Sequence, residues 1–222
     1  MRSIKSFCAS AIAIFVVAIN LSAQVPVREE PRHKVVLEND YVRLLDVHIA
    51  AHDTTLTHIH AAPSVIVFLS GTTIGTQIVG DKANISDVNP GQTSYAAYDE
   101  KPITHRVWNQ SNSTFHVMDI ELVKKNISDD SCSIINAEAI HLQWQQKLVR
   151  TYKINLEKGK TFEIQKSNCA YLLIDIKGVI TTASSGNSHL LKDGGFVFAK
   201  PQTGINISSN SSNAECVLLE LK

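Results

Sequence analysis

The second half of the chain repeats the first half, and this internal repeat constrains the fold more than any other feature of the sequence. A shift of 107 residues brings matching segments into register. It places Val42-Arg43 on Val149-Arg150, Val65-Ile66-Val67 on Leu172-Leu173-Ile174, and Gly71 on Gly178. Strand register decides which side chains face inward, so an offset kept through a loop indicates two copies of one structural unit.

Each copy consists of short β-type runs separated by turn residues. In the first half these runs cover residues 41–49, 65–69, 73–79, 93–98, 105–108 and 115–123. Many short strands at near-regular spacing are typical of an all-β sandwich or barrel. The sequence therefore predicts two all-β domains, at residues 28–123 and 148–222. The polar segment 124–147 is expected to be a linker that could include a short helix around residues 137–146, and residues 28–34 are expected to be a polar entry segment.

The first 23 residues are expected to be a signal peptide and not part of the fold. A short basic start, residues 1–5, precedes an apolar stretch that runs to about Leu21, and the small residues Ser22 and Ala23 form a cleavage site. The alternative is an N-terminal membrane anchor, but the apolar run is short for a span of roughly 20 residues. We therefore expect cleavage after Ala23, a periplasmic or secreted protein, and no stable membrane insertion afterwards.

The balance of charged residues limits the kinds of partner that the chain is expected to bind. Lysine plus arginine and aspartate plus glutamate each number 21, so the formal net charge is zero. This balance provides no electrostatic attraction for nucleic acid, which is not expected as a partner.

After signal cleavage, Cys132, Cys169 and Cys216 remain. An exported chain can form one disulfide between two of them or keep three buried thiols, and the spacing does not decide between these alternatives.

His58-Ile59-His60 is the segment of the sequence that most strongly indicates a binding or catalytic site. Residues i and i+2 of a strand point to the same face, so the two imidazoles would project together. His105 shares its strand face with apolar Val107, which indicates that it points inward. A third histidine on a neighbouring strand would complete a facial ligand set for a divalent metal ion. Two packed or solvated histidines are the alternative explanation of His58 and His60 taken alone.

These histidines and their spacing resemble the two motifs of the cupin superfamily. The first motif is His-x-His, three or four residues, Glu, six residues, Gly. Here Ser64 stands at the Glu position before Gly71. The second motif ends in His-x3-Asn, and His105-x3-Asn109 fits this end, although the gap after Pro90-Gly91 is much longer than usual.

The resemblance implies two tandem cupin barrels of the double-stranded β-helix (jelly-roll) type, a bicupin. It also implies a divalent metal ion held by His58, His60 and His105. Because the carboxylate ligand is missing, the site resembles the three-histidine variants of the family or a weak metal binder. The counterparts in the second half are Gln165, Ser167 and Asn206, so the second domain is expected to be a degenerate cupin without metal ligands.

Two classes of function are consistent with this resemblance. The first is a metal-dependent dioxygenase acting on a small organic substrate, with iron as the first choice of metal and Mn, Ni, Cu or Zn as alternatives; a lyase or isomerase could use the same site. The second is a non-catalytic bicupin that binds a small ligand such as a sugar or an acid. A structural protein whose barrels form a homodimer is a third alternative.

The other histidines show weaker patterns. His48 is expected on the outside of its strand, and His116 is expected either at the rim of the pocket or packed in the core. His33 has no partner pattern.

Overall fold

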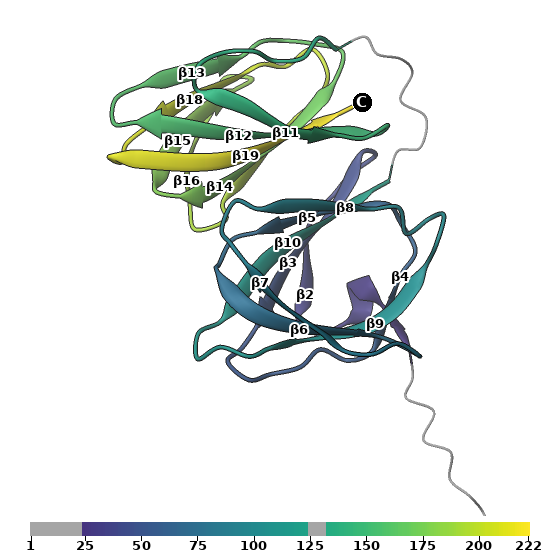
Figure 1. The fold of residues 1–222 in the computed structure, drawn as a ribbon. Helices are drawn as coiled ribbons and strands as arrows, with labels where there is room; N and C mark the ends of the chain where they lie inside the picture. Colours follow the sequence, from purple (N-terminus) through teal and green to yellow (C-terminus); the bar gives the residue numbers. More distant parts are fainter. Residues whose placement is uncertain (1–23, 124–131) are drawn as a thin grey trace, which may run out of the picture.

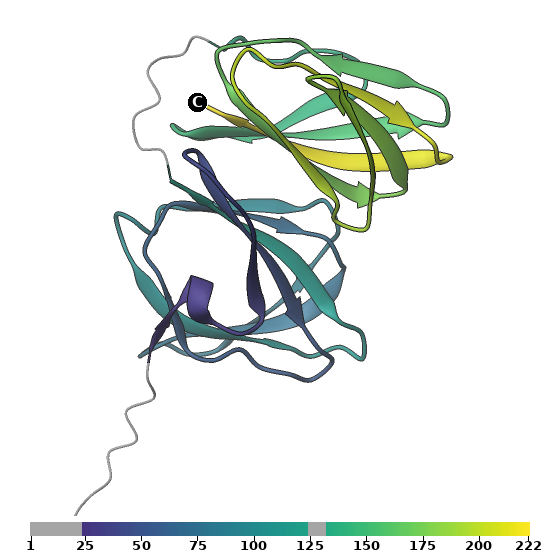
Figure 2. The same ribbon diagram turned by 180° about the vertical axis from the view of Figure 1, so that it is seen from behind.

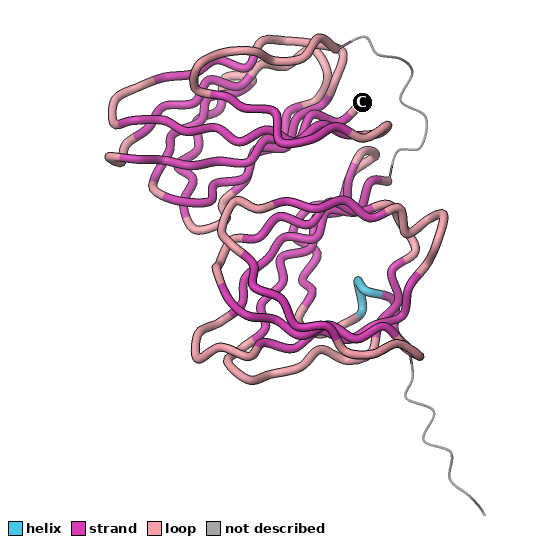
Figure 3. Tube along the Cα trace, viewed as in Figure 1, coloured by secondary structure: helices cyan, strands magenta, loops and turns pink. Residues whose placement is uncertain are grey.

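The computed structural model describes residues 24–123 and 132–222. Its strands form two β-barrels, one from each half of the chain (Figures 1 and 2). The regular elements are strands, apart from one short 3-10 helix near the N-terminal end (Figure 3). The prediction of an all-β fold with two tandem barrels is confirmed. The predicted signal peptide, residues 1–23, lies outside the described residues.

The first barrel contains two five-stranded sheets, in the orders β1-β4-β9-β6-β7 and β2-β3-β10-β5-β8. The first sheet comprises β1 (Val25–Pro26), β4 (His58–His60), β6 (Thr72–Ile78), β7 (Asn84–Val88) and β9 (Ile103–Asn109). The second comprises β2 (His33–Glu38), β3 (Val42–Ile49), β5 (Ser64–Phe68), β8 (Thr93–Ala96) and β10 (Phe115–Leu122). The 3-10 helix η1 (Val27–Glu29) connects β1 to β2.

The second barrel repeats this topology. Its sheets have the orders β11-β12-β19-β14-β17 and β13-β18-β15-β16, which correspond to β2-β3-β10-β5-β8 and β4-β9-β6-β7 of the first barrel. The first of these sheets comprises β11 (Ile140–Gln145), β12 (Val149–Glu157), β14 (Ala170–Lys177), β17 (Phe196–Ala199) and β19 (Asn213–Leu221). The second comprises β13 (Thr161–Ile164), β15 (Val179–Ser184), β16 (Asn187–Lys192) and β18 (Ile205–Ser209).

The structure differs from the predicted boundaries at two places. Val25 pairs with His58, so the first barrel begins before residue 28. The helix considered for residues 137–146 is wrong, because Ile140–Gln145 is strand β11, paired antiparallel with β12. Ile140 is buried inside the second barrel, and this tertiary contact outweighs any local helical tendency.

The two barrels pack against each other through one face of β3, β5 and β10 and one face of β12, β14 and β19. A shared apolar cluster joins Leu44, Val67 and Ile120 of the first barrel to Leu172 and Leu219 of the second. Alternate residues of each strand point the other way, into the interior of their own barrel. The face between the barrels and the barrel interiors are therefore separate cores.

Each barrel has an arginine–glutamate ion pair at the equivalent position of the repeat. Arg43 on β3 bonds to Glu121 on β10, with 2.6 Å between Nη1 and Oε2. Arg150 on β12 bonds to Glu220 on β19, with 2.9 Å between the same atoms. The two arginines are aligned by the 107-residue shift, so this pairing is part of the repeated architecture.

One disulfide cross-links two segments of the second barrel. Cys132, which precedes β11, is bonded to Cys169, which precedes β14. Cys216 on β19 is buried with a free thiol. The structure thus selects one of the alternatives that the sequence left open.

Candidate metal centre

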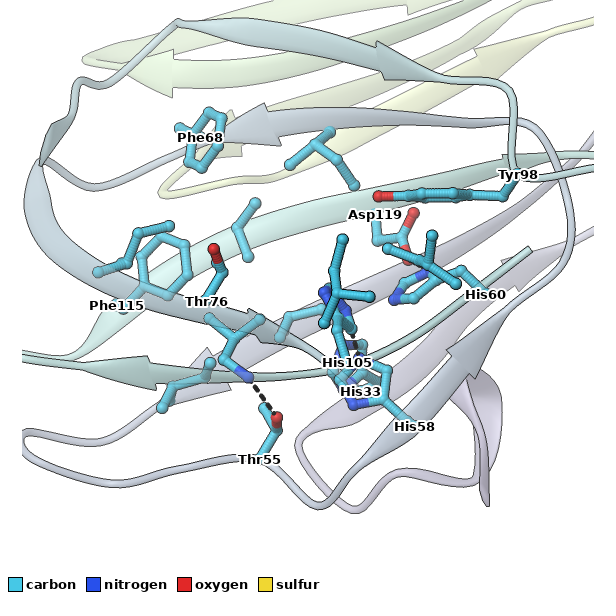
Figure 4. Close-up of a pocket in the computed structure, with 18 residues that line it drawn as sticks. His33, Thr55, His58, His60, Phe68, Thr76, Tyr98, His105, Phe115 and Asp119 are labelled. Atoms are coloured by element: carbon cyan, nitrogen blue, oxygen red, sulfur yellow. Dashed lines mark hydrogen bonds and ion pairs between the residues drawn. The ribbon is translucent and has the colours of Figure 1, made fainter. Parts of the chain in front are cut away.

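The three candidate ligands come together on two paired strands of the first barrel. His58 and His60 lie on the same face of β4, as their spacing predicts. His105 on β9 pairs directly with His58 in the antiparallel register. His58 is 0% exposed and His60 is 4% exposed, so both rings face the barrel interior and not solvent. Figure 4 shows the rings grouped at one end of the cavity.

The ring nitrogens of His58 and His105 converge. Their Nε2 atoms are 3.1 Å apart, and the ring centroids of the two residues are 4.6 Å apart. Two ligand atoms each about 2.1 Å from one ion, at an angle near 90°, would be about 3 Å apart. His58 Nδ1 lies 2.8 Å from the carbonyl oxygen of Leu56, so Nδ1 is the protonated nitrogen and Nε2 keeps its lone pair.

His60 completes the group. One ring nitrogen from each of His58, His60 and His105 lies within 4.8 Å of the other two. Both nitrogens of His60 are buried and have no hydrogen-bond partner. A buried polar atom without a partner is costly, and such atoms are rare unless a ligand, ion or water satisfies them. The donor set and the partnerless imidazole therefore fit a divalent transition-metal ion.

Burial keeps all three imidazoles neutral at physiological pH. Desolvation is the main cause in each case, and it lowers the pKa of His58 to about 4, that of His105 to about 3 and that of His60 to about 2. The neighbouring rings contribute further, because each would repel a second positive charge. Neutral imidazole is the form that coordinates metals.

The histidines open onto a cavity of about 300 Å³ inside the first barrel. Its walls are mainly apolar side chains from both sheets, including Val47, Ile66, Phe68 and Phe115. Tyr98 also lines it, with its ring centroid 5.0 Å from that of His60. The volume lies at the lower end of the range for small-molecule sites.

Two residues of the predicted polar entry segment belong to this site, and the sequence reasoning missed both. His33 lines the cavity, with its ring centroid 4.8 Å from that of His58. Glu30 is 1% exposed, and its carboxylate lies 2.7 Å from His33 Nδ1. It also accepts the backbone N–H groups of Arg32 and Leu56. The entry segment is therefore a wall of the site, and Glu30 orients the His33 ring within it.

Asp119 is the third residue that the sequence reasoning missed. It projects from β10 into the cavity, 2% exposed, and neither carboxylate oxygen has a hydrogen-bond partner. Its Oδ2 lies 3.5 Å from His60 Nδ1. Burial raises the pKa of Asp119 to about 7, so the contact with neutral His60 is not an ion pair. Alternation places Asp119 on the same face of β10 as Val117, but the strand is buried on both faces, so the sequence does not indicate which face points into the cavity.

Two of the remaining histidines lie outside the cavity. His48 is exposed, as predicted. His116 is neither at the pocket rim nor in a core: it is half-buried on the outer face of β10, where its Nε2 lies 2.7 Å from Asp46 Oδ1. Its strand neighbours Met118 and Ile120 face the second barrel, which explains the wrong direction inferred from alternation.

The second barrel has isoleucines where the first has metal-ligand candidates. The backbone N–H of Asn109 donates to Asp53, and that of Ser209 donates to Lys160 in the equivalent place. His105 therefore corresponds to Ile205, four residues before Ser209, and not to Asn206.

Ile205 pairs with Ile164 as His105 pairs with His58. Both isoleucines are 0% exposed and belong to the apolar cluster that fills the second barrel. His58 therefore corresponds to Ile164, which lies one residue before the predicted counterpart Gln165. The constant shift of 107 misplaced Gln165 because β13 is offset from β4 by 106 residues (164 − 58). Asn206 was assigned from the resemblance of Asn206-x3-Asn210 to His105-x3-Asn109, which is displaced by one residue from the structural match.

Comparison with solved structures places this architecture among known folds. AerE from Microcystis aeruginosa matches with a TM-score of 0.61 and 13% sequence identity, over 87% of this chain and 98% of AerE. Salicylate 1,2-dioxygenase from Pseudoaminobacter salicylatoxidans, solved as adducts with gentisate, matches with a TM-score of 0.60 and 8% identity, over 82% of this chain and 68% of the enzyme. A cupin 2 conserved barrel domain protein from Leptotrichia buccalis matches with a TM-score of 0.55 and 10% identity, over 86% of this chain and 88% of that protein.

The chain has a bicupin fold. At these identities the likeness establishes the fold alone. No protein-family model matches the sequence, and the comparison with curated proteins found no match either. Within the described part of the bicupin, no helix has the length and apolar character needed to cross a membrane.

Proposed function

We propose that this protein is an exported, metal-dependent dioxygenase that acts on a small organic acid inside its first barrel. The observation that carries the proposal is the meeting of three neutral imidazoles in a buried, apolar cavity. In this proposal His58, His60 and His105 hold a divalent metal ion, with iron as the first choice. The ion would supply Lewis acidity and a binding position for dioxygen.

The other polar residues of the cavity have supporting roles in the proposal. The Leu56 carbonyl orients His58 through Nδ1, as outer contacts of metal-bound histidines commonly do. His33, oriented by Glu30, offers a ring nitrogen that can form a hydrogen bond with a bound substrate. Asp119 contacts His60 through Nδ1 and supplies a carboxyl group that can hold or release a proton near neutral pH.

The cavity favours a small, mostly apolar substrate, which in this proposal carries one acidic group that binds the metal ion. Its volume of about 300 Å³ suits a single ring. None of the described residues that line it is Lys or Arg. A substrate carboxylate would therefore depend on the metal ion for its countercharge, since burying an unpaired anion is costly. The similar structure of salicylate 1,2-dioxygenase with gentisate supports the choice of aromatic acids as first substrates to test.

Export to the periplasm or secretion is part of the proposal. The N-terminal pattern of basic start, apolar stretch and small-residue site supports it. The bond between Cys132 and Cys169 supports it independently, because stable disulfides are typical of oxidising compartments.

The alternative function is a non-catalytic bicupin that binds a small ligand. Ser64 at the position of the family's carboxylate ligand favours it, because three histidines alone hold a metal ion less firmly. The filled interior of the second barrel is consistent with both functions.

The test compares metal content and oxygen uptake in matched variants. His58→Ile combined with His105→Ile copies the residues that the second barrel uses at these positions, so the variant should fold. His141→Ala, on the exposed surface of β11, is the control. Anaerobic loading with Fe(II) should show that the double variant binds one equivalent less than wild type and the control. Equal iron in all three proteins would refute the metal site.

Oxygen uptake separates the two functions. With gentisate and salicylate as probes, the iron-loaded wild type and His141→Ala proteins should consume oxygen, and the double variant should not. Retained iron and ligand-induced stabilisation without oxygen uptake, across a broader set of small acids, would favour the binding protein.

A further inference from the structure

A second group of ligand-type side chains lies on the outer face of the first barrel, outside the cavity. His48 on β3 and His116 on β10 occupy directly opposite positions in the antiparallel pair. Asp46 precedes His48 by two residues and therefore projects from the same face of β3. None of these three residues lines the cavity or takes part in the proposed dioxygenase site.

The three side chains converge on one point. His116 Nε2 is 2.7 Å and His48 Nε2 is 3.2 Å from the same carboxylate oxygen, Asp46 Oδ1. The two imidazole rings are stacked, with centroids 4.0 Å apart and planes 21° apart, and the Nε2 atom of each approaches Asp46 Oδ1. The three ligand atoms lie within 4.8 Å of one another. Zinc requires all three ligand atoms at about 2.0–2.2 Å from one point, so binding would rotate these side chains and turn the two stacked rings away from each other.

The group lies at the edge of the interface between the two barrels, a place called the seam below. Its strand face continues into Leu44 and Met118, which are buried against the second barrel. Gly194 of the second barrel approaches so closely that a Cβ there would lie 3.0 Å from His116 Cε1. The side chains remain accessible to solvent, with exposed fractions of 25% for Asp46, 48% for His48 and 20% for His116.

We propose that Asp46, His48 and His116 bind a divalent transition-metal ion at this seam. Two imidazole nitrogens and one carboxylate oxygen suit Zn²⁺, Cu²⁺ or Ni²⁺, whereas Mg²⁺ and Ca²⁺ prefer sites made of oxygen alone. The ion would replace the direct contacts that His48 Nε2 and His116 Nε2 now make with Asp46 Oδ1. Because all three ligands come from β3 and β10, binding would stabilise the folded first barrel beside its contact with Gly194.

Zn²⁺ titration in a protein without the cavity histidines tests this site alone. In the His58→Ile/His105→Ile background, isothermal titration calorimetry should detect one equivalent of Zn²⁺. Adding His48→Ala should weaken that binding at least about tenfold, since it removes one of three ligands. The side chain of His48 is half exposed, so its loss should leave the fold intact, which circular dichroism would verify. His141→Ala, added instead, should leave the affinity unchanged.

The outcomes separate the seam site from the proposed function. If the background protein shows no Zn²⁺ binding, or if His48→Ala leaves its affinity unchanged, the seam proposal is wrong and the dioxygenase proposal is unaffected. If wild type and the background protein bind the same number of ions and His48→Ala removes the binding, the cavity site fails and the seam site stands. Asp46→Asn gives a second check, because it keeps the size of the side chain and should also weaken Zn²⁺ binding.

Discussion

Replacement of Asp119 by asparagine should stabilise the metal-free protein, and the gain should depend on pH. Burial raises the pKa of Asp119 from 3.8 to about 7, a difference of about 3 units. Each unit corresponds to about 1.4 kcal/mol, so ionising Asp119 in the folded protein costs roughly 4 kcal/mol. An asparagine side chain at this position would fill the same space without carrying a charge.

The sign of the effect follows from the direction of the shift. The folded protein holds the Asp119 proton more tightly than the unfolded chain does. Its contribution to stability is therefore present below about pH 3.8 and is lost as the pH rises towards 7. The advantage of Asp119→Asn should be small at pH 4, grow by about 1.4 kcal/mol per pH unit, and level off above pH 7.

Urea unfolding of wild type and Asp119→Asn at several pH values, with a chelator present, measures this difference. Taking the difference between the two proteins cancels the titration of the histidines that both share. Asp175→Asn is the matched control, because Asp175 is also buried without a hydrogen-bond partner and burial raises its pKa to about 7. Metal added to the cavity should reduce the advantage of Asp119→Asn and leave that of Asp175→Asn unchanged. A difference curve for Asp119→Asn that is flat from pH 4 to 8 would refute the reasoning.

Two further predictions concern the second barrel. Changing both Cys132 and Cys169 to serine opens a loop that spans 37 residues and should lower the free energy of unfolding by about 4 kcal/mol. Urea unfolding measures the loss, and an equal midpoint for the variant and the oxidised wild type would contradict it. Glu220→Leu leaves the buried Arg150 guanidinium without its carboxylate and should cost about 3–5 kcal/mol. Thermal unfolding checks this prediction, which a loss below about 1 kcal/mol would contradict.

Much of the architecture was predictable from the sequence because its signals are local. Short runs of β-type residues, turn residues between them and a constant shift between the halves indicated two β-barrels. The spacing of His58 and His60 indicated a shared face, since neighbouring side chains in a strand alternate by geometry. The sequence predicted that His105 points inward from a neighbouring strand, and the structure adds that it pairs directly with His58.

Other parts of the site depended on contacts between distant segments. Glu30 and His33 come from a stretch that reads as polar in the sequence. Pairing of Val25 with His58 in the first sheet and of His33 with Val47 in the second sheet brings this stretch to the wall of the cavity. Asp119 lies in a strand that is buried on both sides, where alternation alone does not tell which side faces the cavity and which faces the second barrel.

The direction of the His116 side chain, on the opposite face of the same strand, could not be inferred from the sequence for the same reason. By itself the sequence determined most of the strands, the repeat and the pair of histidines, because these depend on residue type and spacing along the chain. Only the tertiary structure decided which face of each strand became the inside of a barrel and which became the interface between barrels. That choice depends on how the sheets close and pack, and closure brings together residues far apart in the sequence.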